Sequence, residues 1–519
     1  MATVVKIPIF AIFIIEFFGG AIMIKLNFEK YRDKVNACWL GKNIGGTMGT
    51  PYEGTTEYLD IKGFVTKKGE VLPNDDLDLQ LIWLLALERD GAKKINAALL
   101  GEYWLSYIVP YWNEYGIGKA NMRRGLAAPL SGDFENSWRD SNGAWIRTEI
   151  WACVTPGNAG AAAKYAIEDA KVDHGVGEGT YAAAFVAAMQ SAAFIFSDIR
   201  KCIDIGLAGI PEDCRVAKSV KFVIDAYDKG MNERDTRNAV QQMNADIGNG
   251  WFEAPSNIAY TVLGLIFGEG DFKKSMIAAI NCGDDTDCTG ATVGATLGIL
   301  NGMAGIPEDW REYLGDDIIT LSLNRASSAR NLPKTCTELT ERVVRVAPGA
   351  LFNNFEINID KNKSDVSITW GEEYIPEDVY DIEMYLVKRT KKSLDRIKLY
   401  SLEFEAFAYR AIITLPDGPR IAPGGDVRVQ VSFLNKYHDH DDALYTLSLS
   451  WITPDGFEVI GGEKSLMLTN WTSHSMDLLA TTEVVIKAED AVASKNRIVL
   501  EVECDGRPSV LYCPITLLG

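Results

Sequence analysis

The stretch from Asn281 to Asn301, NCGDDTDCTGATVGATLGILN, decides the fold that we expect for this chain. It contains a polar cluster, Asp284 to Asp287, and continues as a run of apolar and small side chains. Gly294, Ala295 and Gly298 are spaced at three and four, the period of an α-helix, and their small size lets another helix approach closely. The stretch therefore predicts a buried helix with carboxylates at its N-terminus, where the helix dipole favours negative charge.

A glycine-rich stretch from Cys38 to Glu53, CWLGKNIGGTMGTPYE, lies early in the chain. Glycines at 41, 45 and 49 are compatible with a phosphate-binding loop, but GxxxxGK[ST] is absent and the run follows a helical pattern rather than a strand. The spacing of four more simply indicates close helix packing. Glu53, in the loop that follows, is a candidate acid or base.

A second acidic cluster, Asn74-Asp75-Asp76, precedes a helix that we expect to begin near Leu77. Alone it is unspecific, because Asp and Asn are favoured as caps at helix starts. Together with Asp285 and Asp287, however, it brings four carboxylates and an amide oxygen to the ends of two buried helices, where they would repel each other without a cation. Hard oxygen ligands indicate Mg²⁺, Mn²⁺ or Ca²⁺.

Zinc is disfavoured, because His174 is the one histidine of the first 346 residues and neither HExxH nor CxxC occurs there. The segment His438-Asp439-His440-Asp441-Asp442 could bind a metal weakly. We interpret it instead as a solvated loop between two strands.

The hydrophobic period changes along the chain, which predicts a multi-domain protein. From Phe28 to about Val346, apolar residues recur at three and four, as a helical domain requires. Beyond Pro348 they alternate, as at 427, 429, 431 and 433, between turn signals such as Pro454-Asp455-Gly456. We therefore expect an all-α domain over 25–346 and an all-β, immunoglobulin-like sandwich over 347–519.

The charge and the cysteines exclude several classes of function. The net charge of −19 and the pI near 4.8 disfavour non-specific binding to nucleic acid or to anionic membranes, so a small polar substrate or a protein partner fits better. Nine cysteines without CxxC spacing, in a long chain, indicate free thiols and a reducing compartment. Cys504 and Cys513 flank a turn that would not place them opposite each other.

The N-terminal segment 1–24 leaves several interpretations open. Residues 7–24 are apolar over nearly the length of a membrane span, interrupted by Glu16 and by Gly19-Gly20. A membrane anchor or export signal, a buried first segment, and an extension upstream of a start at Met23 are all compatible with it. Because an acidic residue within a membrane span is costly, we expect a cytoplasmic protein rather than a membrane-anchored one.

Five segments of the chain resemble motifs of the ADP-ribosyl-glycohydrolase family, which includes the hydrolase acting on dinitrogenase reductase and the ADP-ribosyl-acceptor hydrolases. Cys38–Glu53 resembles the opening helix and loop glutamate, and Asn74–Asp76 the Thr-Asp-Asp motif. Ser141–Arg147 resembles Gly-Asn-Gly-x-x-x-Arg, and Asp173-His174 a Thr-His pair. The most specific motif, Gly-Gly-Asp-Thr-Asp-Thr, resembles Gly283–Cys288, and the series spans about 320 residues.

The resemblance implies an all-α hydrolase domain with one or two magnesium ions that releases ADP-ribose from a small molecule or a protein. The metal ligands that it implies are Asn74, Asp75, Asp76, Asp285, Asp287 and Cys288. Glu53 is the candidate general base, with Asp76 as its rival. The substrate pocket would be lined by Asn142, Gly143, Arg147 and His174. A turn, a helix cap and pairing of Arg147 with acidic residues are the simpler alternatives for these four.

The chain departs from the family's pattern at the metal ligands. Asn74 replaces a threonine, and its amide oxygen can still coordinate a cation. Cys288 stands where threonine adds a hydroxyl, and a thiol is a poor ligand for a hard cation, so one metal position is expected to be weak or empty. Asp284 and Asp78 add negative charge nearby.

Three functions stay open on the sequence alone. The first is magnesium-dependent hydrolysis, with Mn²⁺ as an alternative ion, of a glycosidic bond to ADP-ribose or a related nucleoside or sugar. The second is an ADP-ribose-binding protein that has lost catalysis through the change at Cys288. The third is a magnesium-dependent phosphohydrolase. We expect the β domain to bind a protein or polymer partner, or to brace the helical domain.

Overall fold

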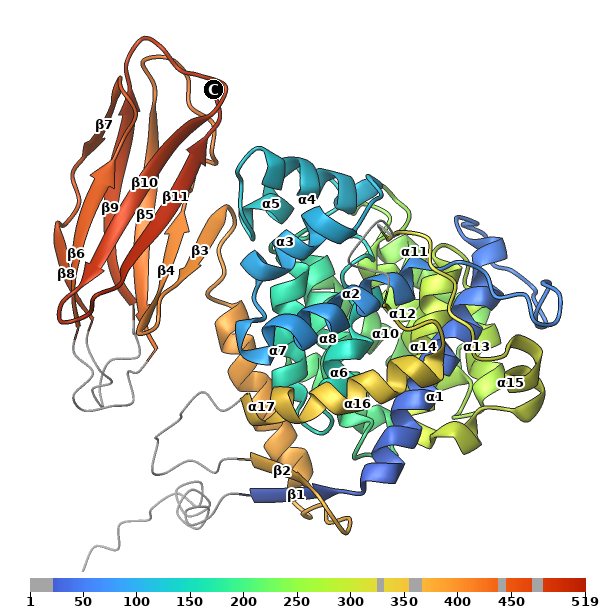
Figure 1. Cartoon of the computed structure of the whole chain (residues 1–519). Helices are drawn as coiled ribbons and strands as arrows, with labels where there is room; N and C mark the ends of the chain where they lie inside the picture. Colours follow the sequence, from blue (N-terminus) through green and yellow to red (C-terminus); the bar gives the residue numbers. More distant parts are fainter. Residues whose placement is uncertain (1–21, 324–330, 354–365, 437–444, 469–478) are drawn as a thin grey trace, which may run out of the picture.

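The computed structural model describes residues 22–323, 331–353, 366–436, 445–468 and 479–519. They form a helical domain and a β-sandwich beside it (Figure 1). The helices of the first domain are α1 (Phe28–Gly49), α2 (Asp75–Asp90), α3 (Ala97–Tyr107), α4 (Asn113–Arg123), α5 (Leu130–Asp133), α6 (Glu149–Val154), α7 (Ala159–Ala170), α8 (Glu178–Ala192), α9 (Ile199–Ala208), α10 (Arg215–Asp228), α11 (Glu233–Met243), α12 (Ala254–Phe267), α13 (Phe272–Asn281), α14 (Thr286–Asn301), α15 (Glu308–Leu314) and α16 (Cys336–Asn353). Short 3₁₀ turns include η2 (Thr50–Tyr52) and η4 (Trp145–Arg147).

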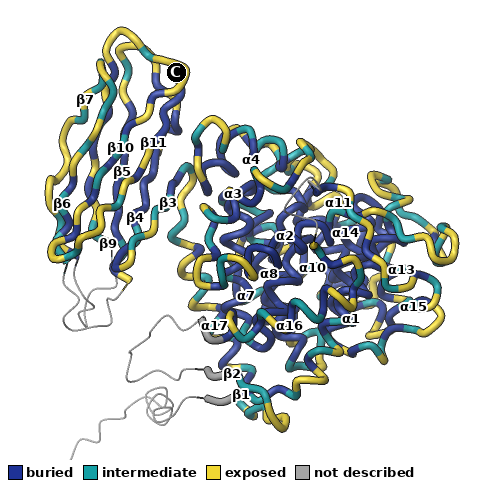
Figure 2. The backbone as a smooth tube through the Cα atoms, in the orientation of Figure 1, coloured by how far each residue is buried: buried dark blue, intermediate teal, exposed yellow. Residues whose placement is uncertain are grey.

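Helices α1 and α14 pack against each other through glycines at the centre of the domain. A Cβ atom added to Gly41 would lie 2.6 Å from the carbonyl carbon of Gly294, and one added to Gly45 would lie 2.5 Å from the amide nitrogen of Ala291. The carbonyl of Ala37 leaves no room for a Cβ on Gly298. The two backbones therefore touch without intervening side chains, as the glycine spacing predicted. Nearly all of α14 and the part of α1 from Ala37 to Gly49 lie in the buried interior of the domain (Figure 2).

The segment between the two domains belongs to the helical part. Strand β1 (Ile22–Leu26) pairs in parallel with β2 (Val366–Trp370), and helix α17 (Val379–Leu394) packs on α7 and α9. The sandwich thus begins at Ser401, later than the expected boundary at residue 347. Pro348 does not end the helical region either, since α16 continues through it to Asn353.

The docking of α17 buries a carboxylate, which makes stability depend on pH. Oε2 of Glu383 accepts a hydrogen bond of 2.7 Å from the Ala159 amide, whereas Oε1 accepts none within the described residues. Burial raises the pKa of Glu383 from 4.5 to about 8. Because the folded state retains this proton, its contribution to stability is present below pH 4.5 and is lost as the pH rises through about 8.

Glu383→Gln should therefore stabilise the protein in alkaline but not in acidic solution. Glutamine mimics the protonated acid, so we expect a gain of the order of 1–2 kcal/mol at pH 9 and little change at pH 4.5. Thermal unfolding followed by circular dichroism at both pH values measures the difference. An equal effect at the two pH values would show that ionisation of Glu383 does not oppose folding.

The C-terminal domain consists of two antiparallel sheets that form a sandwich. One has the strand order β11-β10-β6-β8 and the other β3-β4-β5-β9-β7. Inward residues alternate along the strands, as at Val427, Val429 and Val431 on β5, which confirms the predicted period of two. The strands are β3 (Ser401–Glu405), β4 (Tyr409–Thr414), β5 (Asp426–Asn435), β6 (Tyr445–Ile452), β7 (Phe457–Ile460), β8 (Ser465–Leu468), β9 (Leu479–Ala488), β10 (Asn496–Cys504) and β11 (Val510–Leu517).

The sandwich shares its core with the helical domain. Leu126, Leu130 and Phe134, which flank or belong to α5, pack in the same apolar cluster as the strands. The buried ammonium of Lys171, the residue that follows α7, lies 3.0 Å from the Glu403 carboxylate on β3. The two domains are therefore joined by an apolar contact and a buried ion pair.

Several further expectations concern single segments. All nine cysteines are buried thiols, and Cys513 lies opposite Leu500, not Cys504. Among the residues with a described structure, no helix is both long and apolar enough to cross a membrane. Residues 1–21 of the N-terminal segment, and the segment His438–Asp442, lie outside the described residues, and the expected cytoplasmic location stays a prediction.

Candidate metal centre

The two acidic clusters meet because their helices begin beside each other. Asn74 caps α2: its Oδ1 accepts a hydrogen bond of 2.7 Å from the Asp76 amide. The Asn74 side chain also fills the space beside Gly46 of α1. The C-terminal end of α1, at Gly49, contacts the first residues of α14. Asn74 thus has the capping role that the sequence left open, and its role as a metal ligand stays a prediction.

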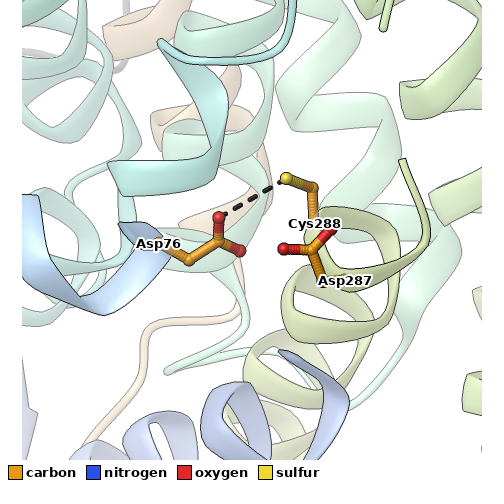
Figure 3. A group of neighbouring side chains, drawn as sticks. All are labelled: Asp76, Asp287 and Cys288. Carbon is orange, nitrogen blue, oxygen red and sulfur yellow. Dashed lines mark hydrogen bonds between the residues drawn. The ribbon is translucent and has the colours of Figure 1, made fainter. Parts of the chain in front are cut away.

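One group of potential ligands joins α2 and α14. Asp76, Asp287 and Cys288 each offer an atom within 4.8 Å of the others, and all three are buried. In Figure 3 the Cys288 thiol points at Asp76, donating a hydrogen bond of 3.4 Å to Oδ1. Burial and then the nearby aspartates raise the pKa of Cys288, so the sulfur keeps its proton. A thiol that donates to a ligand is itself a poor ligand for a hard cation.

A second group shares Asp287 and contains oxygen donors alone. Glu53, Asp285 and Asp287 likewise offer atoms within 4.8 Å of one another. Glu53 follows η2, and its loop is tied to the second cluster because the Gly54 amide donates to the Asp284 carbonyl at 2.8 Å. Asp284 accepts from the Phe252 amide and from Asn257, so both of its carboxylate oxygens are engaged in hydrogen bonds.

The carboxylates of this centre fit a divalent cation. Oδ1 of Asp285 and Oδ1 of Asp287 are buried and accept no hydrogen bond from the described part of the chain. Burial and repulsion from Asp285 and Glu53 raise the pKa of Asp287 well above its ordinary value. Burial, with Asp285 and Asp75, raises that of Glu53 to about 7. Such groups are the hard, negatively charged donors that Mg²⁺ prefers.

A buried lysine ammonium contacts the group formed by Asp76, Asp287 and Cys288 through Asp76. Lys42 of α1 is fully buried, with Nζ 3.4 Å from Asp76 Oδ2 and 3.2 Å from Glu149 Oε2. Although burial alone lowers the pKa of a lysine, Glu149 and Asp76 raise that of Lys42 above its ordinary value. Gln80 and Gln190 donate to the two Glu149 oxygens. Sequence reasoning did not assign Lys42 or Glu149 to the site.

Asn142 reaches the centre from the segment before η4. Its Nδ2 donates to Asp285 Oδ2 at 2.6 Å, and its Oδ1 accepts from the Trp145 indole at 3.0 Å. Gly143 packs closely on Glu114, because a Cβ added to it would meet the Glu114 carboxylate. The predicted pair Asn142-Gly143 therefore lies beside the acidic centre, where Asn142 orients Asp285.

Arg147 and His174 contact the segment that carries Asn142 and Gly143. The Arg147 guanidinium is fully buried and pairs with Asp169 at 2.9 Å and Asp173 at 2.7 Å, while also donating to the Gly143 carbonyl. His174 is equally buried, with Nδ1 2.9 Å from Asp173 and Nε2 3.3 Å from the Ser141 hydroxyl. This geometry favours positioning roles for both side chains, and substrate contact by them stays a prediction.

Two residues of α4 complete the surroundings and were not predicted. Glu114 Oε2 accepts from the Ser141 hydroxyl at 2.8 Å, and burial raises the pKa of Glu114 to about 7. The Tyr115 hydroxyl donates to Asp75 Oδ2 at 3.0 Å. The sequence signal for them, a polar residue and an aromatic residue within one helical turn, is too common to identify a site.

Exposed aromatic rings stand near both acidic clusters. Trp251 is 40% exposed and stacks on Phe252, whose amide donates to Asp284. Trp112 is 46% exposed and stacks on Tyr115, which holds Asp75. Flat apolar rings of this kind can contact a base or a sugar ring.

Comparison with known proteins assigns the family. The model of the ADP-ribosylglycohydrolase family matches residues 27–347. A solved structure described as an ADP-ribosylglycohydrolase-related protein complex is similar over 62% of this chain and 98% of its own, with 19% identity and a TM-score of 0.39. No curated protein matches the chain. Because the family model covers more than half of the chain, including all the residues of the centre, the protein belongs to the ADP-ribosylglycohydrolase family.

Proposed function

We propose that the helical domain is a magnesium-dependent hydrolase that cleaves a glycosidic bond to ADP-ribose or to a related nucleoside or sugar. The observation that carries the proposal is the group Glu53, Asp285 and Asp287, with two buried carboxylate oxygens lacking a donor among the described residues, in a chain of this family. The exposed rings of Trp112 and Trp251 support a substrate with a planar base or a sugar.

The residues of the centre have different roles in the proposed reaction. A bound Mg²⁺ supplies a Lewis acid and a fixed point for vicinal hydroxyls. Asp285 and Asp287 would hold that ion, and Asn142 fixes the orientation of Asp285. As the leaving group departs, positive charge grows at the anomeric carbon, and the surrounding carboxylates stabilise it.

Glu53 is the better candidate than Asp76 for accepting a proton from the attacking water. The Glu53 side chain is exposed, so water can reach it, and its loop stands at the exposed side of the centre. Asp76 is fully buried, and its oxygens are engaged by Cys288 and Lys42. Asp76 is therefore better suited to a structural role in the centre than to accepting a proton from water.

Release of ADP-ribose from ADP-ribosylated protein tests the proposed function. We expect release with Mg²⁺ or Mn²⁺ and none in EDTA, measured by chromatography of the soluble product. Binding of free ADP-ribose without turnover would favour the alternative of a binding protein. The Cys288 thiol in the ligand group supports that alternative. Release of inorganic phosphate without ADP-ribose would favour a phosphohydrolase.

A further inference from the structure

We propose, building on the divalent-metal site proposed above, that each chain binds one divalent cation, between Glu53, Asp285 and Asp287, and that the Lys42 ammonium takes the place of a second. The two ligand groups share Asp287, so they would describe two adjacent ion positions. Their remaining members differ in a way that assigns the ion to one position.

The position between Asp76, Asp287 and Cys288 is already satisfied by protein groups. Oδ1 of Asp76 accepts the Cys288 thiol, and Oδ2 lies 3.4 Å from the Lys42 ammonium. An ion bound to Asp76 and Cys288 at this position would have to displace the hydrogen bond between them. It would also stand close to a buried positive charge, which repels it strongly where water does not screen the interaction.

The position between Glu53, Asp285 and Asp287 shows the opposite pattern. Its buried oxygens Asp285 Oδ1 and Asp287 Oδ1 accept no hydrogen bond from the described residues. Within the same described part of the chain, no lysine or arginine forms an ion pair with any of the three carboxylates. Neighbouring negative charges without a counter-charge favour a cation. The ion therefore belongs on this side.

The surroundings of Lys42 show that its charge is built into the fold. Its side chain is fully buried, and Glu149, its second partner, is held by Gln80 at 2.7 Å and Gln190 at 3.1 Å. A buried carboxylate pair of this kind needs a permanent counter-charge, because leaving either carboxylate unpaired in the interior is costly. Lys42 provides it without depending on the supply of metal.

The number of ions bound by the full-length protein tests the proposal. Mn²⁺ is titrated into metal-free protein, and free Mn²⁺ is measured by its electron paramagnetic resonance signal. We expect one ion per chain for the wild type and for Cys288→Ser, which offers an oxygen but keeps Lys42. We expect two for the double variant Lys42→Met with Cys288→Ser, because the second position then has free carboxylates and no ammonium.

Lys171→Met provides a matched control. Lys171 is also a buried lysine between two carboxylates, Glu168 and Glu403, but it lies at the contact with the sandwich. We expect it to leave the count at one. Circular dichroism establishes that each variant is folded.

Each outcome decides the proposal. Two ions in the wild type would overturn it while leaving the proposed hydrolase intact, and two in Cys288→Ser would show that the thiol, not Lys42, excludes the second ion. If the double variant does not fold, the counts of these two proteins still decide. No Mn²⁺ bound by the wild type would instead contradict the metal dependence of the proposed function.

Discussion

Asp287→Asn is expected to abolish magnesium-dependent turnover while leaving a folded protein. Asp287 is the one carboxylate common to both ligand groups, and its Oδ1 has no hydrogen-bond donor in the described chain. Losing such a ligand removes several kcal/mol of metal binding and charge stabilisation, which corresponds to about 10³-fold in turnover. Release of ADP-ribose at saturating Mg²⁺ measures the loss.

Thermal unfolding separates the loss of a ligand from a damaged fold. Without metal, Asp287→Asn should melt at a higher temperature than the wild type, because repulsion from Asp285 and Glu53 is relieved. Adding Mg²⁺ should then raise the melting temperature of the wild type alone. Glu383→Gln, an isosteric buried change on α17, should retain both turnover and the response to Mg²⁺. A variant of Asp287 that still responds to Mg²⁺ would place the ion elsewhere.

Gly45→Ala is expected to destabilise the helical domain by about 3 kcal/mol or more, because one methyl group meets immovable backbone. Its Cβ would lie 2.5 Å from the Ala291 amide nitrogen. Relief requires α1 and α14 to separate, which would also shift Asp287 relative to Asn74 and the start of α2. The urea concentration at the midpoint of unfolding and the affinity for Mn²⁺ should therefore both be lower than in the wild type.

Gly101→Ala is the matched control for this change. Gly101 also lies inside a helix, α3, but its added Cβ would meet only the flexible Met122 sulfur, at 3.0 Å. We expect a change within about 1 kcal/mol, because the better helix propensity of alanine offsets a small rearrangement. Equal effects at Gly45 and Gly101 would contradict the close approach of α1 to α14.

The sequence predicted those parts of the fold that depend on a period or a spacing. Small residues at intervals of four in α1 and of three and four in α14 predicted close helix packing, and the structure shows that the two helices pack on each other. The alternation expected beyond Pro348 predicted the strands of the sandwich. Helix α17 was missed although apolar residues at 379, 382, 386 and 394 follow a helical period. The expected β domain included this segment because the strands beyond it alternate with a period of two, whereas the segment is helical and packs on α7.

The candidate site could be predicted only where its residues are grouped in the sequence. Asp75, Asp76, Asp285 and Asp287 stand in two short runs, and their mutual repulsion indicates a shared cation. Lys42 and Glu149 are single charged residues whose burial and pairing arise from tertiary packing, 3.2 Å apart yet more than a hundred positions apart in the chain. Hydropathy assigns such residues to the surface.

The backbone contact between α1 and α14 separates the geometry of the centre from its chemistry. Since glycines and not side chains set the distance between the helices, the residues at the start of α14 can be exchanged without moving the frame that carries them. The family resemblance places a threonine where this chain has Cys288, and such an exchange would change the chemistry of the proposed ligand group without changing the spacing of the helices. The spacing of the two helices and the identity of the side chains at the start of α14 are therefore set by different residues.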